Sequence, residues 1–194
     1  MKSVCVYCGS SSRADEWYFA AARAVARVIA GRGLTLVYGG ARVGLMGALA
    51  DEALRLGGRV VGVIPRALVE KEVAHTGLTQ QHVVESMHDR KALMSELAGG
   101  FIALPGGFGT LDELFEALTW AQLKFHSKPV GLLDVAGYFD GLLAFCRRAV
   151  EDGFIHPAHV DMIHVSDDPG ALLDSMDGHV PPDAGKWWKR PDGS

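Results

Sequence analysis

The sequence has no excess of basic residues. Its 194 residues include 19 Lys and Arg against 23 Asp and Glu, which gives a formal net charge of -4 and a pI near 6.0. Such a chain lacks the positive field that attracts nucleic acids or anionic membrane surfaces. We therefore expect no nucleic acid and no membrane as partner, and we expect any phosphate to be recognised by a local site.

Long hydrophobic runs are also missing. No stretch approaches the roughly 20 apolar residues of a transmembrane helix. A strand-like segment begins at once, without the charged and then apolar region of a secretory signal. Only three cysteines occur, which is typical of proteins in a reducing compartment. These features predict a cytoplasmic location.

The spacings of cysteine and histidine that would hold a metal are absent as well. Cys5 and Cys8 form a C-x-x-C pair, but residues three apart in a strand point to opposite faces and lie roughly 10 Å apart, too far for a disulfide. No second cysteine pair completes a zinc site, and the 8 histidines include no H-E-x-x-H pattern. We therefore expect two packed cysteines, no metal and no cofactor.

What the sequence does contain is a regular alternation of strand-like apolar runs and helical patterns, which builds a parallel sheet covered on both faces. We predict an α/β fold, a Rossmann-like doubly wound parallel sheet, as a single domain over residues 1–176 with a Pro- and Gly-rich tail over residues 177–194. Trp187 and Trp188 in this tail either dock on a partner subunit or belong to an unstructured end. The predicted strands are Ser3 to Cys8, Leu34 to Tyr38, Val60 to Ile64, His82 to Val84, Phe101 to Leu104, Val130 to Leu133 and Met162 to Val165. The predicted helices are Asp15 to Ala30, Leu45 to Leu56, His88 to Ala98, Leu111 to Leu123, Tyr138 to Asp152 and Pro169 to Met176.

Glycine and hydroxyl residues follow three of the predicted strands. In doubly wound sheets, ligands bind outside the carboxyl ends of the strands, so these loops should converge on one crevice, with Gly9 and Ser10 among the ligand contacts. The glycines from Gly39 to Gly47 are explained equally well by a tight turn without a ligand. The segment from Arg66 to Gln81 has weak periodicity and is predicted to be a long loop at the mouth of the crevice.

The most informative stretch is PGGFGTLDE, from Pro105 to Glu113. It lies between a buried strand and a helical pattern, where free first-turn amides and the helix dipole favour an anion such as phosphate, and where glycine lets the backbone approach it. Thr110 and Glu113 match a capping box. Capping and ligand binding are compatible uses of Thr110, whereas capping and catalysis explain Glu113 equally well. Glu116 follows one turn later on the same helix face, where paired acids are usually solvated.

A second cluster, MHDRK, lies at a predicted helix start, where Ser86 and Asp89 have the spacing of a capping box. The adjacent Arg90 and Lys91 oppose the helix dipole, which prefers acids at this end. Two explanations remain open. Either both cations are solvated on the surface, or an acidic ligand or Glu113 lies close to them.

Together, the two clusters resemble the Lonely Guy (LOG) family of cytokinin riboside 5′-monophosphate phosphoribohydrolases, whose hallmark is P-G-G-x-G-T-x-x-E. Neither cluster departs from the family pattern, since Asp112 fills a variable position. The resemblance covers nearly everything but the tail, and it includes the segments Val6 to Ser11, Tyr38 to Gly40, Gly44 to Gly47 and Thr119 to Leu123.

This resemblance implies hydrolysis of the N-glycosidic bond of AMP or of N6-prenylated AMP to free base and ribose 5-phosphate. It implies Arg90 and Glu113 as the catalytic pair, and a homodimer with active sites near the subunit interface. Apolar residues near that interface, with Met87 and Trp120 as candidates, would hold the N6 group. The implied nucleotide contacts are Glu72, Arg90, Lys91, Gly106, Gly107, Phe108, Gly109, Thr110, Leu111, Asp112 and Thr119.

Two other functions compete with hydrolysis. A nucleotide or molybdenum-cofactor carrier of the same fold would use the same loops without cleaving a bond, and it would not need Glu113. The lysine decarboxylase label that is often attached to relatives of this family would require a Schiff-base lysine and a partner for the pyridine nitrogen. The sequence offers no evident candidates for these two roles.

Overall fold

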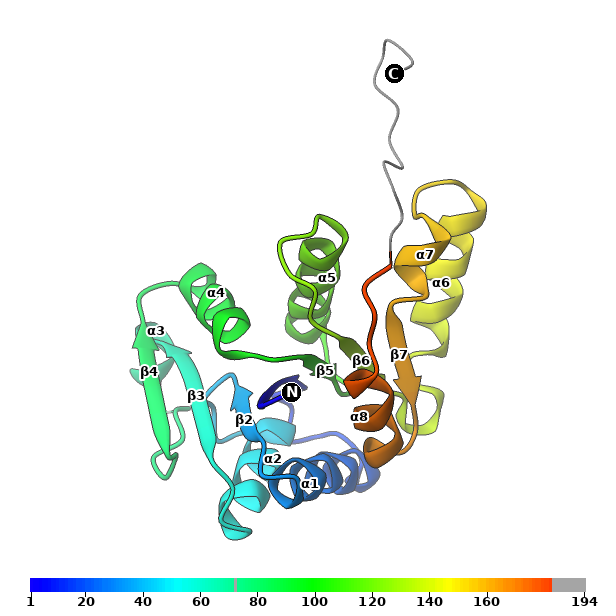
Figure 1. The fold of residues 1–194 in the computed structure, drawn as a ribbon. Helices are drawn as coiled ribbons and strands as arrows, with labels where there is room; N and C mark the ends of the chain where they lie inside the picture. Colours follow the sequence, from blue (N-terminus) through cyan, green and yellow to red (C-terminus); the bar gives the residue numbers. More distant parts are fainter. Residues whose placement is uncertain (72, 183–194) are drawn as a thin grey trace.

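The structure, a computed structural model, describes residues 1–71 and 73–182. It contains one seven-stranded sheet in which every strand pair is parallel, in the order β4-β3-β2-β1-β5-β6-β7 (Figure 1). The α/β doubly wound prediction is therefore confirmed. The strands are β1 (Ser3–Tyr7), β2 (Thr35–Tyr38), β3 (Val60–Pro65), β4 (Gln80–Val84), β5 (Phe101–Ala103), β6 (Val130–Leu133) and β7 (Ile163–Ser166).

Helices cover both faces of the sheet (Figure 1). On one face lie α1 (Glu16–Gly31), α2 (Gly44–Arg55) and α8 (Pro169–Asp177), and on the other lie α4 (Met87–Leu97), α5 (Phe108–Gln122) and α6 (Asp140–Glu151). Three short helices belong to the connections, namely α3 (Arg66–Val69), α7 (Pro157–Val160) and the 3-10 helix η1 (Val135–Gly137).

The alternation of side chains along β1 divides the molecule into two hydrophobic cores. Val4, Val6 and Cys8 pack with α1, α2 and α8, whereas Cys5 and Tyr7 pack with α4 and α5. Both cysteines are buried and free, which confirms that the C-x-x-C spacing reflects packing on opposite faces. Burial of both faces also explains why the inner strands are largely apolar runs, whereas the edge strands β4 and β7 are partly exposed and contain polar residues.

All seven predicted strands and six predicted helices are found, with ends shifted by at most three residues. The sequence missed α3 and α7 because four residues are too few for a helical period to stand out. Part of the predicted loop from Arg66 to Gln81 is thus helical. The predicted domain boundary at residue 176 remains a prediction, and Trp187 and Trp188 lie outside the described residues.

The order of the strands creates a switch point between β1 and β5. From β1 the chain adds β2, β3 and β4 on one side, and it then returns to place β5, β6 and β7 on the other. The loops that follow β1 and β5 therefore leave the sheet in opposite directions and open a crevice at the carboxyl ends of the strands.

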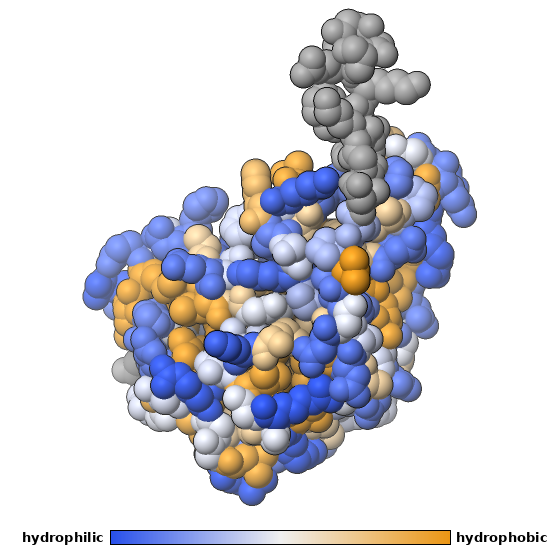
Figure 2. Space-filling model, in the orientation of Figure 1, coloured by the Kyte–Doolittle hydropathy of each residue, from blue (hydrophilic) through white to orange (hydrophobic). Residues whose placement is uncertain are grey.

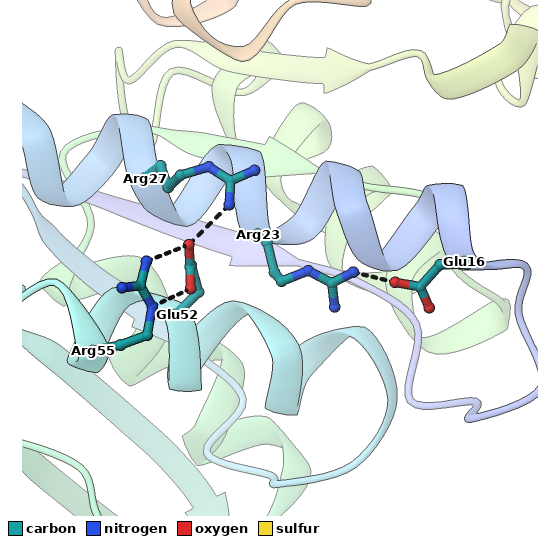
Figure 3. A network of polar contacts seen from close by, with 5 residues as sticks. All are labelled: Glu16, Arg23, Arg27, Glu52 and Arg55. Carbon is teal, nitrogen blue, oxygen red and sulfur yellow. Dashed lines mark hydrogen bonds and ion pairs between the residues drawn. The ribbon is translucent and has the colours of Figure 1, made fainter.

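A charged network joins α1 and α2 on the face away from α4 and α5 (Figure 3). The buried carboxylate of Glu52 accepts hydrogen bonds from Arg27 Nη1 at 2.8 Å and from Arg55 Nε at 2.8 Å. A separate pair links Arg23 to Glu16 within α1. Glu52 therefore fixes the packing of the two helices, because one buried acid is shared by two arginines.

The surface mixes hydrophilic side chains with separate hydrophobic patches (Figure 2). Within residues 1–71 and 73–182, no helix has both the length and the apolar character that a membrane crossing requires. The same residues contain no group of three or more His, Cys, Asp or Glu that could hold a metal ion.

Candidate active site

A cleft of about 400 Å³ lies at the switch point of the sheet. The loops after β1, β2 and β5, the region around α3, helix α4 and the start of α5 contribute to its walls. Its lining residues are Cys8, Gly9, Ser10, Gly39, Ala41, Val43, Met46, Leu68, Val73, Arg90, Gly107, Phe108, Gly109, Thr110 and Glu113.

The start of α5 forms the anion-binding side of this cleft. Gly107 is the N-cap residue, and no side chain caps the helix. The first-turn amides of Phe108, Gly109 and Thr110 therefore have no acceptor within the helix. Their N–H groups and the positive end of the helix dipole favour a phosphate at this position.

The capping box predicted for Thr110 and Glu113 is wrong. The helix begins two residues before Thr110, so this residue lies inside the first turn and its buried side chain lines the cleft. Glu113 lies in the second turn and has no capping role. The spacing misled the prediction because Gly107 occupies the N-cap without using a side chain.

Close packing requires glycine at position 106. A β-carbon on Gly106 would lie 2.2 Å from Thr110 Oγ1 and 2.8 Å from the nitrogen of Gly9. The amide of Gly9 in turn donates to the carbonyl oxygen of Pro105 at 3.1 Å. The loop after β1 is thus fixed directly against the loop after β5.

Arg90 and Glu113 form a buried pair inside the cleft. Nη2 of Arg90 lies 3.3 Å from Oε1 of Glu113, and the two side chains are 10% and 8% exposed. Nε of Arg90 donates to the carbonyl oxygen of Val63 in β3 at 3.2 Å. The arginine is therefore held by the sheet, with its charge beside the carboxylate of Glu113 on α5.

Burial raises the pKa of Glu113 from 4.5 to about 6. The positive charge of Arg90 opposes this rise in pKa, and the nearby Asp112 adds to it. Desolvation of the carboxylate outweighs the ion pair because both groups are removed from water. The carboxylate is ionised at neutral pH but has a pKa close to the operating range of a general base.

Helix α4 begins as the sequence predicts. Oγ of Ser86 accepts from the amide of Asp89 at 3.0 Å, and the amide of Ser86 donates to Oδ2 of Asp89 at 3.1 Å. The predicted capping box is therefore confirmed. It fixes the first turn of α4 and with it the direction in which Arg90 and Lys91 leave the helix.

Lys91 pairs with two acids of α5. Its Nζ lies 3.0 Å from Oδ2 of Asp112 and 3.2 Å from Oε1 of Glu116. Together with the Arg90 pair, these contacts clamp α4 to α5. The interpretation of both cations as solvated surface charges is therefore wrong, since each one is neutralised by α5.

The wall opposite α5 is apolar. The segment after α3 is held against the loop after β2, because the amide of Arg42 donates to Val73 O at 2.8 Å and the amide of His75 donates to Gly40 O at 2.9 Å. The predicted position of this segment at the crevice mouth is confirmed. The apolar lining residues are Ala41, Val43, Met46, Leu68 and Val73.

Sequence reasoning missed this apolar wall. Its residues are scattered over loops and the helices α2 and α3, so they form no common period, and only their place after β2 and β3 could have pointed to them. Met87 and Trp120, the candidates from the sequence, do not line the cleft, and Trp120 lines a separate depression with Phe125.

Cys8 lies in the cleft but is a poor nucleophile. Burial, followed by the charge of Glu113, raises the pKa of its thiol well above the usual value. Only a thiolate attacks efficiently, so Cys8 is unsuited to nucleophilic attack.

The structure unites most of the predicted site residues. Gly9, Ser10, Arg90, Glu113 and the loop residues 107–110 all line the cleft, and Gly106 lines a neighbouring cavity. Lys91, Leu111, Asp112 and Thr119 do not line it, and Thr119 lies exposed about three turns along α5. Glu72 lies outside the described residues, and its contact with a nucleotide remains a prediction.

Comparison with known proteins identifies the family. A family model described as possible lysine decarboxylase matches residues 46–176. A cytokinin riboside 5′-monophosphate phosphoribohydrolase of Rhodococcoides fascians is 53% identical over 158 residues, which cover 81% of this chain and 80% of that protein. The chain belongs to the LOG family. Its plant relatives include a phosphoribohydrolase of the same name from Arabidopsis thaliana, 45% identical over 93% of this chain and 79% of that protein. A probable one from Oryza sativa subsp. japonica is 46% identical over the same shares.

Solved structures with lower identity share the fold of this LOG-family chain. The molybdenum cofactor carrier protein of Chlamydomonas reinhardtii has a TM-score of 0.70 and 22% identity, over 92% of this chain and 98% of that chain. The molybdenum cofactor binding protein of Rippkaea orientalis has a TM-score of 0.68 and 20% identity, over 92% and 97%. At this level of identity the likeness concerns the architecture alone.

A lysine decarboxylase activity, after which the family model is described, does not fit the chemistry of the LOG-family cleft. A decarboxylase that uses pyridoxal phosphate needs a lysine amine to form a Schiff base. No lysine lines the cleft within the part of the chain that the structure describes. Burial lowers the pKa of Lys91, the lysine nearest in sequence to Arg90, but its acidic partners Asp112 and Glu116 outweigh this effect and leave the pKa raised. A raised pKa is the opposite of what such a nucleophile requires.

Proposed function

We propose that this protein hydrolyses the N-glycosidic bond of AMP and of N6-modified (cytokinin) riboside 5′-monophosphates, releasing free base and ribose 5-phosphate. The observation that carries the proposal is the buried Glu113 carboxylate, 3.3 Å from Arg90 and on the same helix as the unpaired amides of Phe108 to Thr110. One helix thus presents a phosphate site and an acid to a single ligand.

The spacing along α5 suits a ribose 5-phosphate. Glu113 follows Phe108 by five residues, which is about 7.5 Å along the helix axis. This distance is comparable to the separation between the phosphate and the anomeric carbon of the sugar. A phosphate held by the first-turn amides therefore brings the bond to be cleaved near the carboxylate, and its binding energy positions the ribose.

Glu113 has the properties that the reaction needs. Cleavage of the bond between the sugar carbon and the base nitrogen builds positive charge on the ribose, as in glycoside hydrolysis. A carboxylate in a water-poor cleft stabilises that charge and orients or deprotonates the attacking water. Arg90 keeps the carboxylate in place through its fork of donors, and its remaining N–H groups can bind the ligand.

The apolar wall provides a site for the base. Val43, Met46, Leu68 and Val73 lie on the side of the cleft that faces the start of α5. A purine ring that leaves the ribose toward these residues would bury apolar surface, and an N6 prenyl group would bury more. Assays with AMP and N6-isopentenyl AMP side by side measure this preference.

The direct test is incubation of the purified chain with each nucleotide, followed by chromatography of free base and ribose 5-phosphate. We expect release of both products by the wild type and none by Glu113→Gln or Arg90→Ala. Glu116→Gln is the matched control, because Glu116 is on the same helix, is paired with Lys91 and does not line the cleft. Absence of base release from every nucleotide, with tight binding retained, would instead identify a carrier.

We further propose a homodimer that forms through α5. Phe115, Leu123 and Phe125 are exposed along this helix and the turn after it, and Thr119 shares their side because residues four apart are neighbours on a helix. An interface here would place Thr119 at the subunit boundary, where the family resemblance implies a nucleotide contact. Light scattering should show a dimer for the wild type and a monomer for the double variant Phe115→Asp, Leu123→Asp. Phe145→Asp, which alters an exposed phenylalanine of α6, should remain dimeric.

The cytoplasm is the location that we propose. Cys5, Cys8 and Cys146 are all free thiols, which agrees with a reducing compartment.

A further inference from the structure

We infer that Tyr138 is a positioning residue for the phosphate site, an inference that rests on the proposed function. Tyr138 is 32 residues away from the glycine-rich loop in sequence, yet its hydroxyl donates to the carbonyl oxygen of Gly106 at 2.7 Å. The tyrosine does not line the main cleft. It lines a second cavity of about 310 Å³ on the other side of the loop.

The two cavities share a wall that is formed by the loop after β1 and by the glycine-rich loop after β5. Gly9, Ser10 and Gly107 line both of them, whereas Gly106 and Tyr138 line only the second. A hydrogen bond from the second cavity therefore acts on the back of the surface that would bind the phosphate.

The direction of this hydrogen bond matters because a peptide group is planar. In a trans peptide, the carbonyl of one residue and the N–H of the next point in opposite directions. Tyr138 draws the carbonyl of Gly106 toward the second cavity, so the N–H of Gly107 is directed toward the main cleft. No acceptor for this N–H is found among residues 1–71 and 73–182. By orienting this peptide group, the hydroxyl of Tyr138 makes the N–H of Gly107 a fourth donor beside the three amides of the first turn.

The bond also keeps a carbonyl dipole away from the ligand. The carbonyl oxygen of Pro105 is already occupied by the amide of Gly9 at 3.1 Å. With Gly106 O occupied by Tyr138, both carbonyls of the loop are satisfied outside the phosphate site. A glycine pair has no side chains to fix its peptide orientation, so an external donor is the means of selecting one.

Tyr138 is 44% exposed, but several contacts fix its backbone and its ring. It follows Ala136 and Gly137, which adopt φ angles of 54° and 72°, a left-handed conformation that is uncommon for alanine. The next amide, of Phe139, donates to Oδ1 of Asp134 at 2.8 Å. The ring of Tyr138 packs edge-on against Tyr18 at 5.8 Å and against Phe139 at 5.2 Å. Strained turns of this kind are found where a side chain must be placed accurately.

The test is Tyr138→Phe in the full chain, which retains the ring packing and removes only the hydroxyl. One neutral hydrogen bond is worth roughly 1 kcal/mol, so we expect the affinity for ribose 5-phosphate to fall about fivefold, measured by calorimetry. The KM for AMP should rise by the same factor with kcat unchanged, because the amide contacts phosphate equally in the ground and transition states. Affinity for adenosine, which has no phosphate, should not change.

Tyr18→Phe is the matched control, since it removes a hydroxyl from the same aromatic group and the same cavity. It should behave as wild type in all three measurements. Unchanged binding of ribose 5-phosphate by Tyr138→Phe overturns the inference, as does an equal loss of adenosine affinity or a wild type that binds no ribose 5-phosphate. A fivefold loss of binding without any hydrolysis of AMP would retain the role of Tyr138 and refute the proposed reaction. Hydrolysis of AMP by Tyr138→Phe with an unchanged KM would retain the proposed reaction and refute the role of Tyr138.

Discussion

A β-carbon on Gly39 would lie 2.0 Å from Nη2 of Arg90. The guanidinium that pairs with Glu113 therefore occupies the space that any other residue at position 39 would fill with a side chain. The same added carbon would lie 3.1 Å from Cζ of Arg90 and 3.2 Å from Sδ of Met46. Glycine after β2 therefore leaves the space that the Arg90 guanidinium occupies beside Glu113.

Gly39→Ala should inactivate the enzyme without changing any side chain that touches the substrate. The extra methyl group must displace the guanidinium, and a misplacement of about 1 Å can cost about 100-fold in rate. We expect kcat/KM for AMP to fall by about that factor. Gly31→Ala is the control, because a β-carbon there meets nothing within 4 Å, and it should retain wild-type kinetics. Wild-type kinetics in Gly39→Ala would show that the position of Arg90 is not critical.

The pH dependence of the reaction should report the ionisation of Glu113. Its pKa, raised by burial to about 6, leaves the carboxylate charged above that pH and neutral below it. If the charged form is the active one, kcat/KM should be constant above about pH 7 and should fall tenfold per pH unit below about 6.

The substrate phosphate also titrates near pH 6, so its contribution must be separated. The profile is therefore repeated with a 5′-phosphorothioate substrate, whose second pKa is lower than that of the phosphate. If the fall of kcat/KM at acid pH is caused by the substrate, it should move to lower pH. If it is caused by Glu113, it should stay where it is. A fall of kcat/KM that shifts with the substrate would show that the ionisation of Glu113 does not control the rate in this pH range.

Much of this arrangement could be predicted from the sequence because its physical causes are local. Strands buried on both faces give apolar runs, and a strand followed by PGGFGT gives an anion site at a helix start. The capping box at Ser86 and Asp89 is also local, since both partners lie within one turn. The sequence could not resolve the start of α5, where Gly107 caps by backbone geometry alone.

The parts that could not be predicted depend on contacts between distant residues. The hydroxyl of Tyr138 reaches Gly106 across 32 residues. Leu68 and Val73 enter the cleft only because backbone hydrogen bonds attach their segment to the loop after β2. Neither contact leaves a period or a motif in the sequence. The burial of Glu113 beside Arg90 is likewise a property of the assembled fold.

Glu52 should contribute to stability and not to activity. Hydrogen bonds from Arg55 and Arg27 lower the pKa of this acid to about 2, so its stabilising effect is present above its ordinary pKa and is lost only as pH falls through about 2. We expect Glu52→Gln to lower the melting temperature at neutral pH by a few degrees with unchanged kcat/KM. Glu16→Gln, which breaks the separate pair between Glu16 and Arg23 within α1 (Figure 3), should have little effect. Equal melting temperatures for wild type and Glu52→Gln would mean that the shared acid does not hold α1 and α2 together.

The charge of Glu113 should cost the folded protein stability, and the cost should appear as pH rises. A folded-state pKa of about 6 against 4.5 for the ordinary group means that the folded protein favours the protonated acid. This contribution is fully present below about pH 4.5 and is lost as pH rises through about 6. The difference corresponds to about 2 kcal/mol.

Urea unfolding of wild type and Glu113→Gln at several pH values isolates this contribution of Glu113, because the other ionisable groups are common to both proteins. From about pH 4 to about pH 7.5, the stability of Glu113→Gln should rise by about 2 kcal/mol relative to wild type. A constant difference would mean that Arg90 cancels the cost of burial, and a change of opposite sign would mean that the ion pair outweighs it. In either case Glu113 would be an ordinary paired carboxylate, and a fall of kcat/KM below about pH 6 would need another origin.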